Sequence, residues 1–495
     1  MMSRDYSQIQ KEIALTGFFS EYLPPCFSLD SEVLTHEQGN KCDLIPPYSF
    51  SMSRFNGNDA RRTIFIPEIG AYLSAYEYMK REDIIQELIE FSESSTHSFS
   101  PILGNENTII KHEQIYGFRS DKNITFHSEY IKNIGKKIIQ SSGAKKILKL
   151  DISNCFSSLY MHMMPTIILG IEKTQEQYEL YKKDRNNTLI DPRYKRYKKL
   201  DEVIRKQNLN RTNGILPGIL SSRIIAEALL TRIDKELDKL EINFARYVDD
   251  YEVFLYDDTE KKVISDISKV LKKYGFSLNF EKTEIIDFPY YIVENFNKIL
   301  ENRFENSISS EELIEIFTFF SNMEKNGVKG SIRFLLKTLE QNAKEIKIED
   351  PSLYKAYLIS VMSNDERSLT KVCSILIENC ELYPLLESDK AFICKLINNH
   401  LVSGHDLEVL WLLYLLIKTK NIALGDPIIT SILNEENELA HLLILTFNLL
   451  DDYQKTIIKQ KSNSWIALYE LFANDWTIVN KVDTIYKEKV PSTAA

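Results

Sequence analysis

The sequence predicts an α+β chain in which a region of turns, strands and helices is followed by an all-α region. Residues 1–300 hold 12 of the 16 glycines and 10 of the 14 prolines, so turns concentrate there. Two apolar, β-rich runs, 146–151 and 242–247, lie in the same part. From about Ser310 onward, apolar residues recur at three- and four-residue spacing between short polar joints, which indicates successive helices.

The helical region fits an irregular array of helical hairpins of HEAT-like character, or else a plain helical bundle. The segments expected to be helical are 311–325, 330–348, 353–362, 368–381, 407–418, 439–450 and 452–472. In the first region, 251–255 continues the second β-rich run after two acids. Strands that end or turn at acids are therefore expected at both runs.

Length and composition limit the class of protein. The 495 residues suffice for several domains, and 43% hydrophobic with 27% charged residues is ordinary globular usage, which excludes a disordered or collagenous chain. The apolar run near 407–417 contains Glu408 and is shorter than the roughly 20 residues of a spanning helix. No signal-peptide core follows Met1. We expect a cytoplasmic protein without membrane segments.

The metal and nucleic-acid signals are mostly negative. The six cysteines form no C-x-x-C pair, and the close pair His400 and His405 is not one helical turn apart, so a zinc site of His and Cys is not expected. Any metal should be held by oxygen. The net charge of -10 argues against a protein that simply coats nucleic acid. A polynucleotide partner needs a local basic track.

One basic stretch meets this requirement. Residues 171–212 contain 12 Lys or Arg against 7 Asp or Glu, a local net charge of +5. Four tyrosines are interleaved with these charges: Tyr178, Tyr181, Tyr194 and Tyr197. The stretch fits either a surface that follows a nucleic-acid backbone and stacks bases, or a solvated charged helix.

Carboxylates carry the chemical argument. Tyr247-Val248-Asp249-Asp250 lies between two apolar runs and fits a hairpin turn, in which the acids either bond their own backbone or bind a ligand. Asp151 ends the first β-rich run, where an acid is costly unless it is paired or bound to metal. If the strands are neighbours, the three carboxylates meet and favour Mg²⁺. Two such ions about 4 Å apart suit polymerase chemistry.

Four motifs in order resemble those of reverse transcriptases. Asp151 matches the first motif, and Phe156 matches the aromatic residue beneath the sugar. Residues 213–223 resemble the second motif, which supports template and incoming nucleotide. Residues 247–250 match the third, and 278–283 resemble the fourth, whose lysine approaches the triphosphate. Four motifs in this order are far more specific than one.

The resemblance implies an organisation and a set of site residues. Residues 1–300 would form the reverse-transcriptase-like domain, with an N-terminal extension, fingers at 50–145 and a palm at 146–300, and 301–495 would form the HEAT-like domain. The implied residues are Asp151, Asp249, Asp250 and Lys282 for catalysis, Asp151, Asp249, Asp250 and the Ile152 carbonyl for two Mg²⁺ ions, and Arg61, Arg62, Phe156, Gly218 and Tyr247 for the nucleotide. A bulky ring at Phe156 would exclude the 2′-hydroxyl of ribonucleotides.

Departures from the common pattern narrow the family. Pro217 stands where the second motif usually carries Gln, and Ser222-Arg223 where many relatives have Ser-Pro. With Arg61-Arg62 and a helical C-terminal half, the chain resembles the abortive-infection reverse transcriptases of bacteria, closest to the prophage-borne AbiK-like group. That group implies a homo-oligomer, trimeric or hexameric, that uses deoxynucleoside triphosphates without a template. It also implies protein priming, a single-stranded DNA product covalently attached to the protein, and phage defence.

Three questions stay open at this stage. A templated enzyme of retron type is the alternative, although it requires a cognate RNA and a basic thumb. A catalytically idle scaffold is the alternative from another class, against which the three acids argue. The priming residue is unknown: Tyr6, Tyr22 and Tyr48 lie in an N-terminal segment expected to be flexible enough to reach the metals, and nothing distinguishes them.

Overall fold

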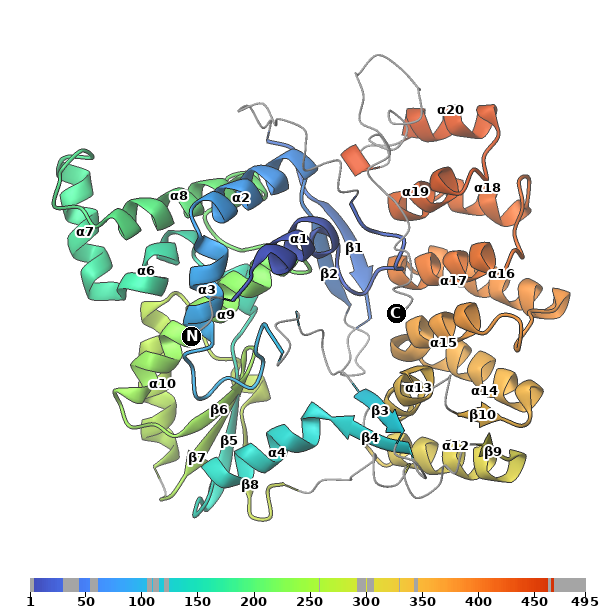
Figure 1. Ribbon diagram of the computed structural model, residues 1–495, viewed down its shortest axis with the longest axis horizontal. Coiled ribbons are helices and arrows are strands. Elements are labelled where there is room, and N and C mark those ends of the chain that lie inside the picture. Colours follow the sequence, from blue (N-terminus) through green and yellow to red (C-terminus); the bar gives the residue numbers. More distant parts are fainter. Residues whose placement is uncertain are drawn as a thin grey trace.

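The computed structural model describes residues 4–29, 44–53, 61–104, 109, 115–119, 124–257, 259–291, 300, 307–328, 330–341, 346–461 and 464–466. Figure 1 shows a mixed part of strands and helices beside a stack of helices. The mixed part is formed by the first 291 residues and the stack begins at Ser310. The predicted α+β region followed by a helical region is therefore confirmed.

A four-stranded antiparallel sheet lies at the centre of the mixed part. Its order is β6-β7-β5-β8, with β5 at Lys146–Asp151, β6 at Phe244–Tyr247, β7 at Asp250–Leu255 and β8 at Glu284–Asp287. The predicted strands thus exist, and β5 and β7 are neighbours. Apolar residues such as Leu148 and Val253 are fully buried, so the sheet contributes to the main core.

Helices cover this sheet and continue the core away from it. The central one is α9, Leu220–Asp238, which packs against α3 and α10. The helices of the mixed part are α1 Ser7–Leu15, α2 Ile69–Arg81, α3 Ile84–Ser92, α4 Glu129–Gln140, α5 Cys155–Ser158, α6 Met164–Leu169, α7 Ile171–Lys183, α8 Pro192–Lys206, α9 and α10 Glu260–Lys273, with short 3₁₀ turns at Thr16–Phe18, Met161–Met163 and Phe280–Lys282. Two hairpins complete it, β1 Tyr48–Met52 with β2 Arg62–Ile66 and β3 Ile115–Arg119 with β4 Ile124–Ser128.

The second region is a stack of paired helices (Figure 1). Its elements are β9 Ser307–Ile308, α12 Ser310–Lys325, α13 Ser331–Gln341, β10 Lys347–Ile348, α14 Pro351–Asn364, α15 Glu366–Glu378, α16 Glu387–Val402, α17 Asp406–Lys418, α18 Pro427–Leu433, α19 Glu438–Thr446 and α20 Asp452–Lys461. The helices α16 and α18 were not predicted. The segment 330–348 is not one helix. Its first part forms α13, and its last two residues form β10, which pairs with β9. The part of 452–472 beyond Ser464–Ile466 lies outside the described residues.

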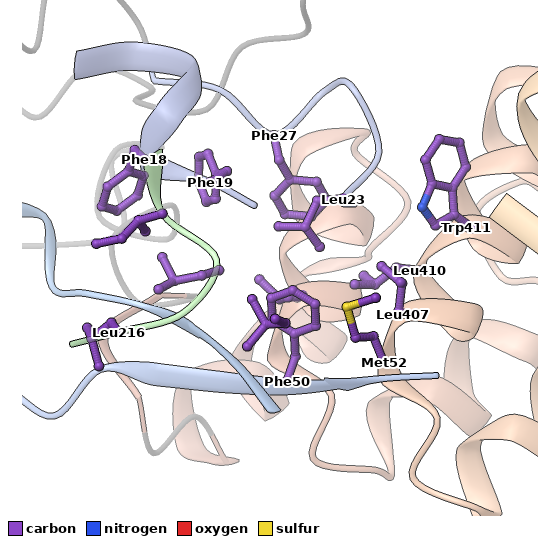
Figure 2. Packing of buried hydrophobic residues seen from close by; sticks show 14 of the residues in the cluster. Phe18, Phe19, Leu23, Phe27, Phe50, Met52, Leu216, Leu407, Leu410 and Trp411 are labelled. Atoms are coloured by element: carbon purple, nitrogen blue, oxygen red, sulfur yellow. The ribbon is translucent and has the colours of Figure 1, made fainter. Parts of the chain in front are cut away.

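The two regions share one hydrophobic core. Figure 2 shows Phe50 and Met52 of β1 beside Leu407 and Leu410 of α17, with Leu23 and other N-terminal side chains above them. Trp411 of α17 donates a hydrogen bond from Nε1 to the backbone oxygen of Tyr22, at 2.8 Å. The β1–β2 hairpin is therefore docked on the helical stack.

The basic stretch 171–212 does not form a stacking surface for bases. Tyr194 and Tyr197 of α8 are buried, and α8 packs against α2. The Tyr197 hydroxyl donates to Glu87 of α3 at 3.1 Å. Only Tyr178, in α7, is largely exposed among the four tyrosines. The interpretation as charged helices agrees with the structure, and tyrosine stacking along this stretch does not.

Two negative expectations from the sequence can be compared with the described residues. The five cysteines among them form no disulfide. No helix in the described ranges is long and apolar enough to cross a membrane.

Candidate active site

The fold brings the three predicted carboxylates to one edge of the sheet. Asp151, the last residue of β5, lies opposite Asp250, the first residue of β7. Tyr247 pairs with Asp250, which leaves Val248 and Asp249 as a two-residue turn. The Ile152 backbone N–H donates to the Asp249 carbonyl at 3.2 Å, fixing the turn against the end of β5. The hairpin predicted from Tyr247-Val248-Asp249-Asp250 is present.

The turn adopts an unusual backbone conformation. Val248 has a φ of 55°, in the left-handed region that a β-branched residue rarely occupies. Such conformations cost on the order of 1–3 kcal/mol and persist only where the surrounding structure imposes them. They are also concentrated at functional sites. Asp249 follows directly, so the direction of its side chain depends on this conformation.

Mutual repulsion marks the site electrostatically. Burial, followed by the charge of Asp151, raises the pKa of Asp249. Part of Asp250 reaches solvent, yet desolvation, the charges of Asp249 and Asp151, and a hydrogen bond with Asp151 raise its pKa to about 7. A group of oxygen ligands that repel one another in this way is suited to hard divalent cations. The donor set therefore fits Mg²⁺.

The fourth motif lies against the first. The Lys282 ammonium forms an ion pair with Asp151, with Nζ 2.9 Å from Oδ1. Asn279 donates from Nδ2 to the other carboxylate oxygen at 3.2 Å, and its backbone N–H donates to the Asp151 carbonyl at 2.8 Å. About half of the Lys282 side chain is exposed, so its amine reaches solvent as well as the carboxylate. Asn279 was not among the predicted site residues.

The second motif joins the β1–β2 hairpin to the residues near Asp151. The Ile215 N–H donates to the Phe156 carbonyl at 2.9 Å, and the Phe65 N–H donates to the Pro217 carbonyl at 3.1 Å. Gly218 has a φ of 112°, and a Cβ built on it would overlap the Cγ2 methyl group of Ile64. Only glycine satisfies both conditions. Gly218 therefore sets the approach of the second motif to β2.

The two predicted aromatic residues occupy different positions. Phe156, in α5, is partly buried and packs against the main core, so part of its ring stays accessible. Tyr247 is the last residue of β6, adjacent to the turn, and is also partly exposed. Ile152 is buried, and its N–H is bonded to the turn. The nucleotide and metal roles of all three stay predictions.

The two arginines predicted to bind the nucleotide lie in different surroundings. Arg61 forms ion pairs with Glu366, at 3.1 Å, and with the buried Glu408 of the helical stack. Its guanidinium thus lies at the junction between the two regions. Arg62, at the start of β2, is exposed and lies close enough to Asp249 to lower the pKa of that carboxyl group. Of the pair, Arg62 is the one whose charge acts on the pKa of Asp249.

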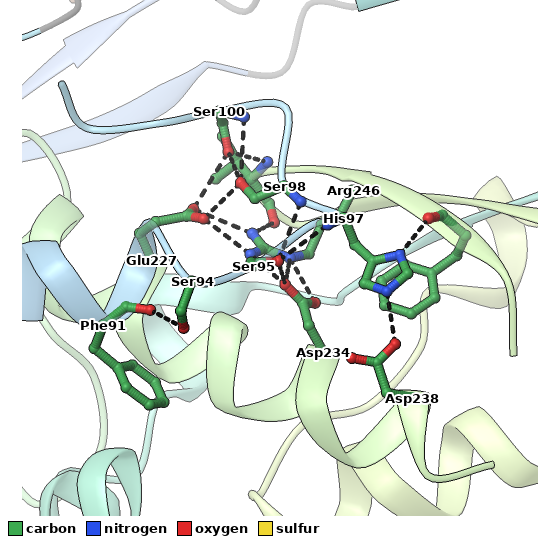
Figure 3. A network of polar contacts seen from close by, with 12 residues as sticks. Phe91, Ser94, Ser95, His97, Ser98, Ser100, Glu227, Asp234, Asp238 and Arg246 are labelled. Atoms are coloured by element: carbon green, nitrogen blue, oxygen red, sulfur yellow. Dashed lines mark hydrogen bonds and ion pairs between the residues drawn. The ribbon is translucent and has the colours of Figure 1, made fainter. Parts of the chain in front are cut away.

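A buried polar network behind the turn was not predicted. Arg246, fully buried in β6, forms ion pairs with Glu227 at 2.9 Å and Asp234 at 2.8 Å, both on α9 (Figure 3). Its Nη1 also donates to the Val248 carbonyl at 2.9 Å, and the Val248 N–H donates to Ser100 Oγ at 2.9 Å. The backbone N–H and carbonyl of Val248 are therefore both hydrogen-bonded. The sequence did contain one indication of this network: Arg246 lies two residues after Phe244 and therefore on the same face of an apolar strand.

The N-terminal tyrosines are part of the folded structure, contrary to the expected flexible segment. Tyr6 is buried, and its hydroxyl donates to Glu90 at 3.2 Å. Tyr48 lies in β1, and burial raises its pKa. Burial also raises the pKa of Tyr22 to about 12, and the hydroxyl is near enough to Arg62 and Tyr247 to feel their charges. Among the three, Tyr22 is the one with an electrostatic link to the site.

Comparison with known proteins was made by sequence and by structure. No curated protein matches the chain. The family model described as reverse transcriptase (RNA-dependent DNA polymerase) matches residues 102–335. This range contains the three carboxylates, the second motif and Lys282. The family match thus covers the same residues that the fold brings together.

Similar solved structures include three of telomerase from Candida tropicalis. The apo enzyme has 14% identity and a TM-score of 0.34, over 88% of this chain and 70% of that chain. The form truncated from the C-terminal domain has 15% identity and a TM-score of 0.30, over 52% and 53%. The complex with the TWJ fragment of telomeric RNA has 15% identity and a TM-score of 0.34, over 77% and 65%. The chain thus matches about half the length of the truncated form.

The geometry and the family match agree on one assignment. The motif residues lie on adjacent strands and turns of a single sheet edge, and the matched range covers them. Residues 102–335 therefore match the reverse transcriptase family, and the carboxylates, the second motif and Lys282 all lie within that match.

Proposed function

We propose that the chain is a magnesium-dependent DNA polymerase of the abortive-infection type, acting in defence against phage. In this proposal it extends a hydroxyl of its own, from a tyrosine, with deoxynucleotides and without a template. The observation that carries the polymerase part is the convergence of Asp151, Asp249 and Asp250 at one sheet edge, with Lys282 2.9 Å from Asp151. The defence role rests on the sequence resemblance.

The metal-binding residues in this proposal are Asp151, Asp249 and Asp250, with the Ile152 carbonyl as a further oxygen. Two bound Mg²⁺ ions would lower the pKa of the attacking hydroxyl and stabilise the leaving pyrophosphate. The raised pKa values of Asp249 and Asp250 support this, since like charges at one edge favour a bound cation. The positive-φ turn at Val248 keeps Asp249 in place without rearrangement at each cycle.

Side chains of the protein would orient the nucleotide. Arg62 is exposed beside the carboxylates, and a guanidinium matches the oxygens of a triphosphate. Lys282 would neutralise or protonate the pyrophosphate after leaving Asp151. Phe156 would exclude the 2′-hydroxyl, and Gly218 and Tyr247 would shape the pocket on either side. Arg61 has no part in this proposed nucleotide site, since its guanidinium pairs with Glu366 and Glu408 at the junction with the helical stack.

Synthesis without a template is supported by sequence and by charge. Pro217 replaces the usual Gln of the second motif, and the net charge of -10 disfavours a long gripped duplex. Tyr22 is the priming candidate to test first, because its hydroxyl is near Arg62 and Tyr247. We further propose a homo-oligomer, trimeric or hexameric, and a HEAT-like helical region from residue 301.

Each part of the proposal has a direct test. Purified protein is incubated with each deoxynucleoside triphosphate alone and Mg²⁺, and the labelled product is run on a denaturing gel before and after protease treatment. We expect label that migrates with the protein and shifts after proteolysis. Tyr22→Phe should stop attachment, whereas Tyr178→Phe, at an exposed tyrosine of α7, should not. Product that runs free of protein contradicts self-priming and leaves the polymerase assignment standing.

A templated reverse transcriptase of retron type is the second candidate. The family description, RNA-dependent DNA polymerase, favours it. In that case incorporation requires an added RNA with an annealed primer, and the order of nucleotides follows the RNA sequence. Incorporation that is unchanged by added RNA contradicts this candidate.

A further inference from the structure

Three metal-ligating side chains of the helical stack converge away from the carboxylate site. They are Glu366 at the start of α15, His400 in α16 and His405 just before α17. His400 Nδ1 lies 3.0 Å from His405 Nδ1, and His405 Nδ1 lies 3.1 Å from Glu366 Oε1. One ligand atom from each lies within 4.8 Å of the other two. Three helices thus supply one potential ligand each.

The joint between α16 and α17 explains why sequence spacing pointed the other way. His400 and His405 are not one turn apart on a single helix; the chain reverses between them at Gly404, which has a φ of 65°. The His405 N–H donates to the His400 carbonyl at 2.9 Å and closes this turn. The reversal brings the two rings together from either side. The expectation that this pair forms no metal site was based on spacing within a helix, and the structure removes that basis.

The contacts suit a shared cation. His405 Nδ1 can use either one hydrogen or one lone pair, yet it lies within hydrogen-bond distance of both His400 Nδ1 and Glu366 Oε1. In a tetrahedral zinc site, ligand atoms about 2.1 Å from the metal are roughly 3.3 Å apart. The His400–His405 and His405–Glu366 separations, 3.0 and 3.1 Å, lie within a few tenths of an ångström of this value.

The surrounding charges leave a deficit that a dication would balance. In the described residues, four charged groups face the cluster: Arg61, which directly precedes β2, Glu366, Asp406 and Glu408. One guanidinium therefore stands against three carboxylates around the two imidazole rings. Imidazole nitrogens with one carboxylate select zinc and similar transition metals over Mg²⁺.

We propose that Glu366, His400 and His405 bind a Zn²⁺-class ion, with water in the fourth position. The site would join the mixed part to the helical stack, because Glu366 also pairs with Arg61, and Arg61 in turn contacts Ser51 of β1 at 3.2 Å. Ser51 is itself bonded to Asp406 at 2.7 Å. The metal would thus hold together the three helix ends on which the β1–β2 hairpin is docked.

The test is metal content and metal-dependent stability of the full chain. Protein stripped with a chelator is titrated with Zn²⁺, and with Co²⁺ followed by its visible absorption bands. Wild type should bind about one tight equivalent, and a chelator should lower its melting temperature. His400→Asn, which keeps a hydrogen-bonding group but supplies no imidazole, and Glu366→Gln should lose that equivalent and the chelator effect.

Two controls separate this site from others. His162→Ala, at a half-exposed histidine bonded to Asp201, should keep the equivalent. Asp249→Asn should also keep it, which excludes zinc held at the carboxylate site. The proposal is overturned if wild type binds no tight Zn²⁺, or if folded His400→Asn and Glu366→Gln bind it as well as wild type does. In either case, the three side chains form only a hydrogen-bonded cluster.

Discussion

Asp249 combines burial, like-charge repulsion and a constrained backbone in one side chain. Asp249→Asn keeps the size of the side chain and removes an anionic ligand, so nucleotide incorporation should fall by at least about 100-fold. The melting temperature should stay the same or rise, because repulsion with Asp151 and Asp250 is relieved. Asp257→Asn, at an exposed acid beyond the end of β7, is the matched control. Normal incorporation by Asp249→Asn would refute the polymerase assignment.

Phe156 is suited to test sugar selection, since its ring is partly accessible and its backbone oxygen is fixed by Ile215. Phe156→Ala should raise the use of ribonucleotides relative to deoxynucleotides by roughly 10-fold or more. Phe156→Tyr retains the bulk and should keep the wild-type ratio. The measurement is kcat/KM for matched ribo- and deoxynucleoside triphosphates. An unchanged ratio in Phe156→Ala assigns the ring to core packing alone.

The sequence was sufficient for residues whose chemistry is local. Asp151 and the pair Asp249-Asp250 could be predicted because acids beside apolar strands are costly without a ligand. Arg61 and Arg246 could not, since their partners are set by tertiary structure. Glu366 lies 305 residues from Arg61, and nothing adjacent to Arg61 distinguishes an ion pair from a triphosphate ligand.

Gly218 determines how closely the second motif approaches β2. Gly218→Ala should destabilise the protein and raise the KM for nucleotides. The new methyl group would displace Ile64 in β2, the strand that begins at Arg62. Gly327→Ala is the matched control: Gly327 also has a positive φ, 93°, but a Cβ there would meet nothing within 4 Å. Comparing the two variants separates the effect of steric overlap with Ile64 from the effect of backbone strain. Equal effects of the two variants on melting temperature would contradict the role of overlap.

The Arg246 network supports the β6–β7 turn. Arg246→Ala leaves Glu227 and Asp234 buried without their cation and should cost about 3–5 kcal/mol of unfolding free energy. Arg193→Ala breaks a half-exposed pair with Asp191 and should cost less than about 1 kcal/mol. Denaturant unfolding measures both. If the two losses are similar, the buried pairs contribute little and the turn is held by other contacts.

At the level of helices and strands, prediction succeeded where the hydrophobic pattern is simple. The run 146–151 coincides with β5, and the helix predicted at 311–325 differs from α12 by one residue. It failed at 330–348, because β10 exists only through its pairing with β9 some 40 residues earlier. It also missed α16, whose buried residues Ile393, Leu396 and Ile397 have helical spacing among many polar neighbours.

For the molecule as a whole, one continuous core connects the region of the carboxylate site to the helical stack. The strand pair that carries Arg62 is bonded to the second motif on one side and docked on α17 on the other. The stack and the mixed part therefore share the same hydrophobic core at this junction. We expect the melting of the stack and the loss of polymerase activity to occur together.

Leu410 of α17 tests this expectation, since it is fully buried beside Phe50 and Met52 (Figure 2). Leu410→Ala should cost about 2–5 kcal/mol through lost burial and the cavity left behind. Val402→Ala, at an exposed residue at the end of α16, should change little. Circular dichroism at helical wavelengths and residual incorporation after heating are followed over the same temperature series. Because one core serves both regions, both curves should shift downward by the same interval in Leu410→Ala, and a shift confined to the helical signal would show that the two regions melt independently.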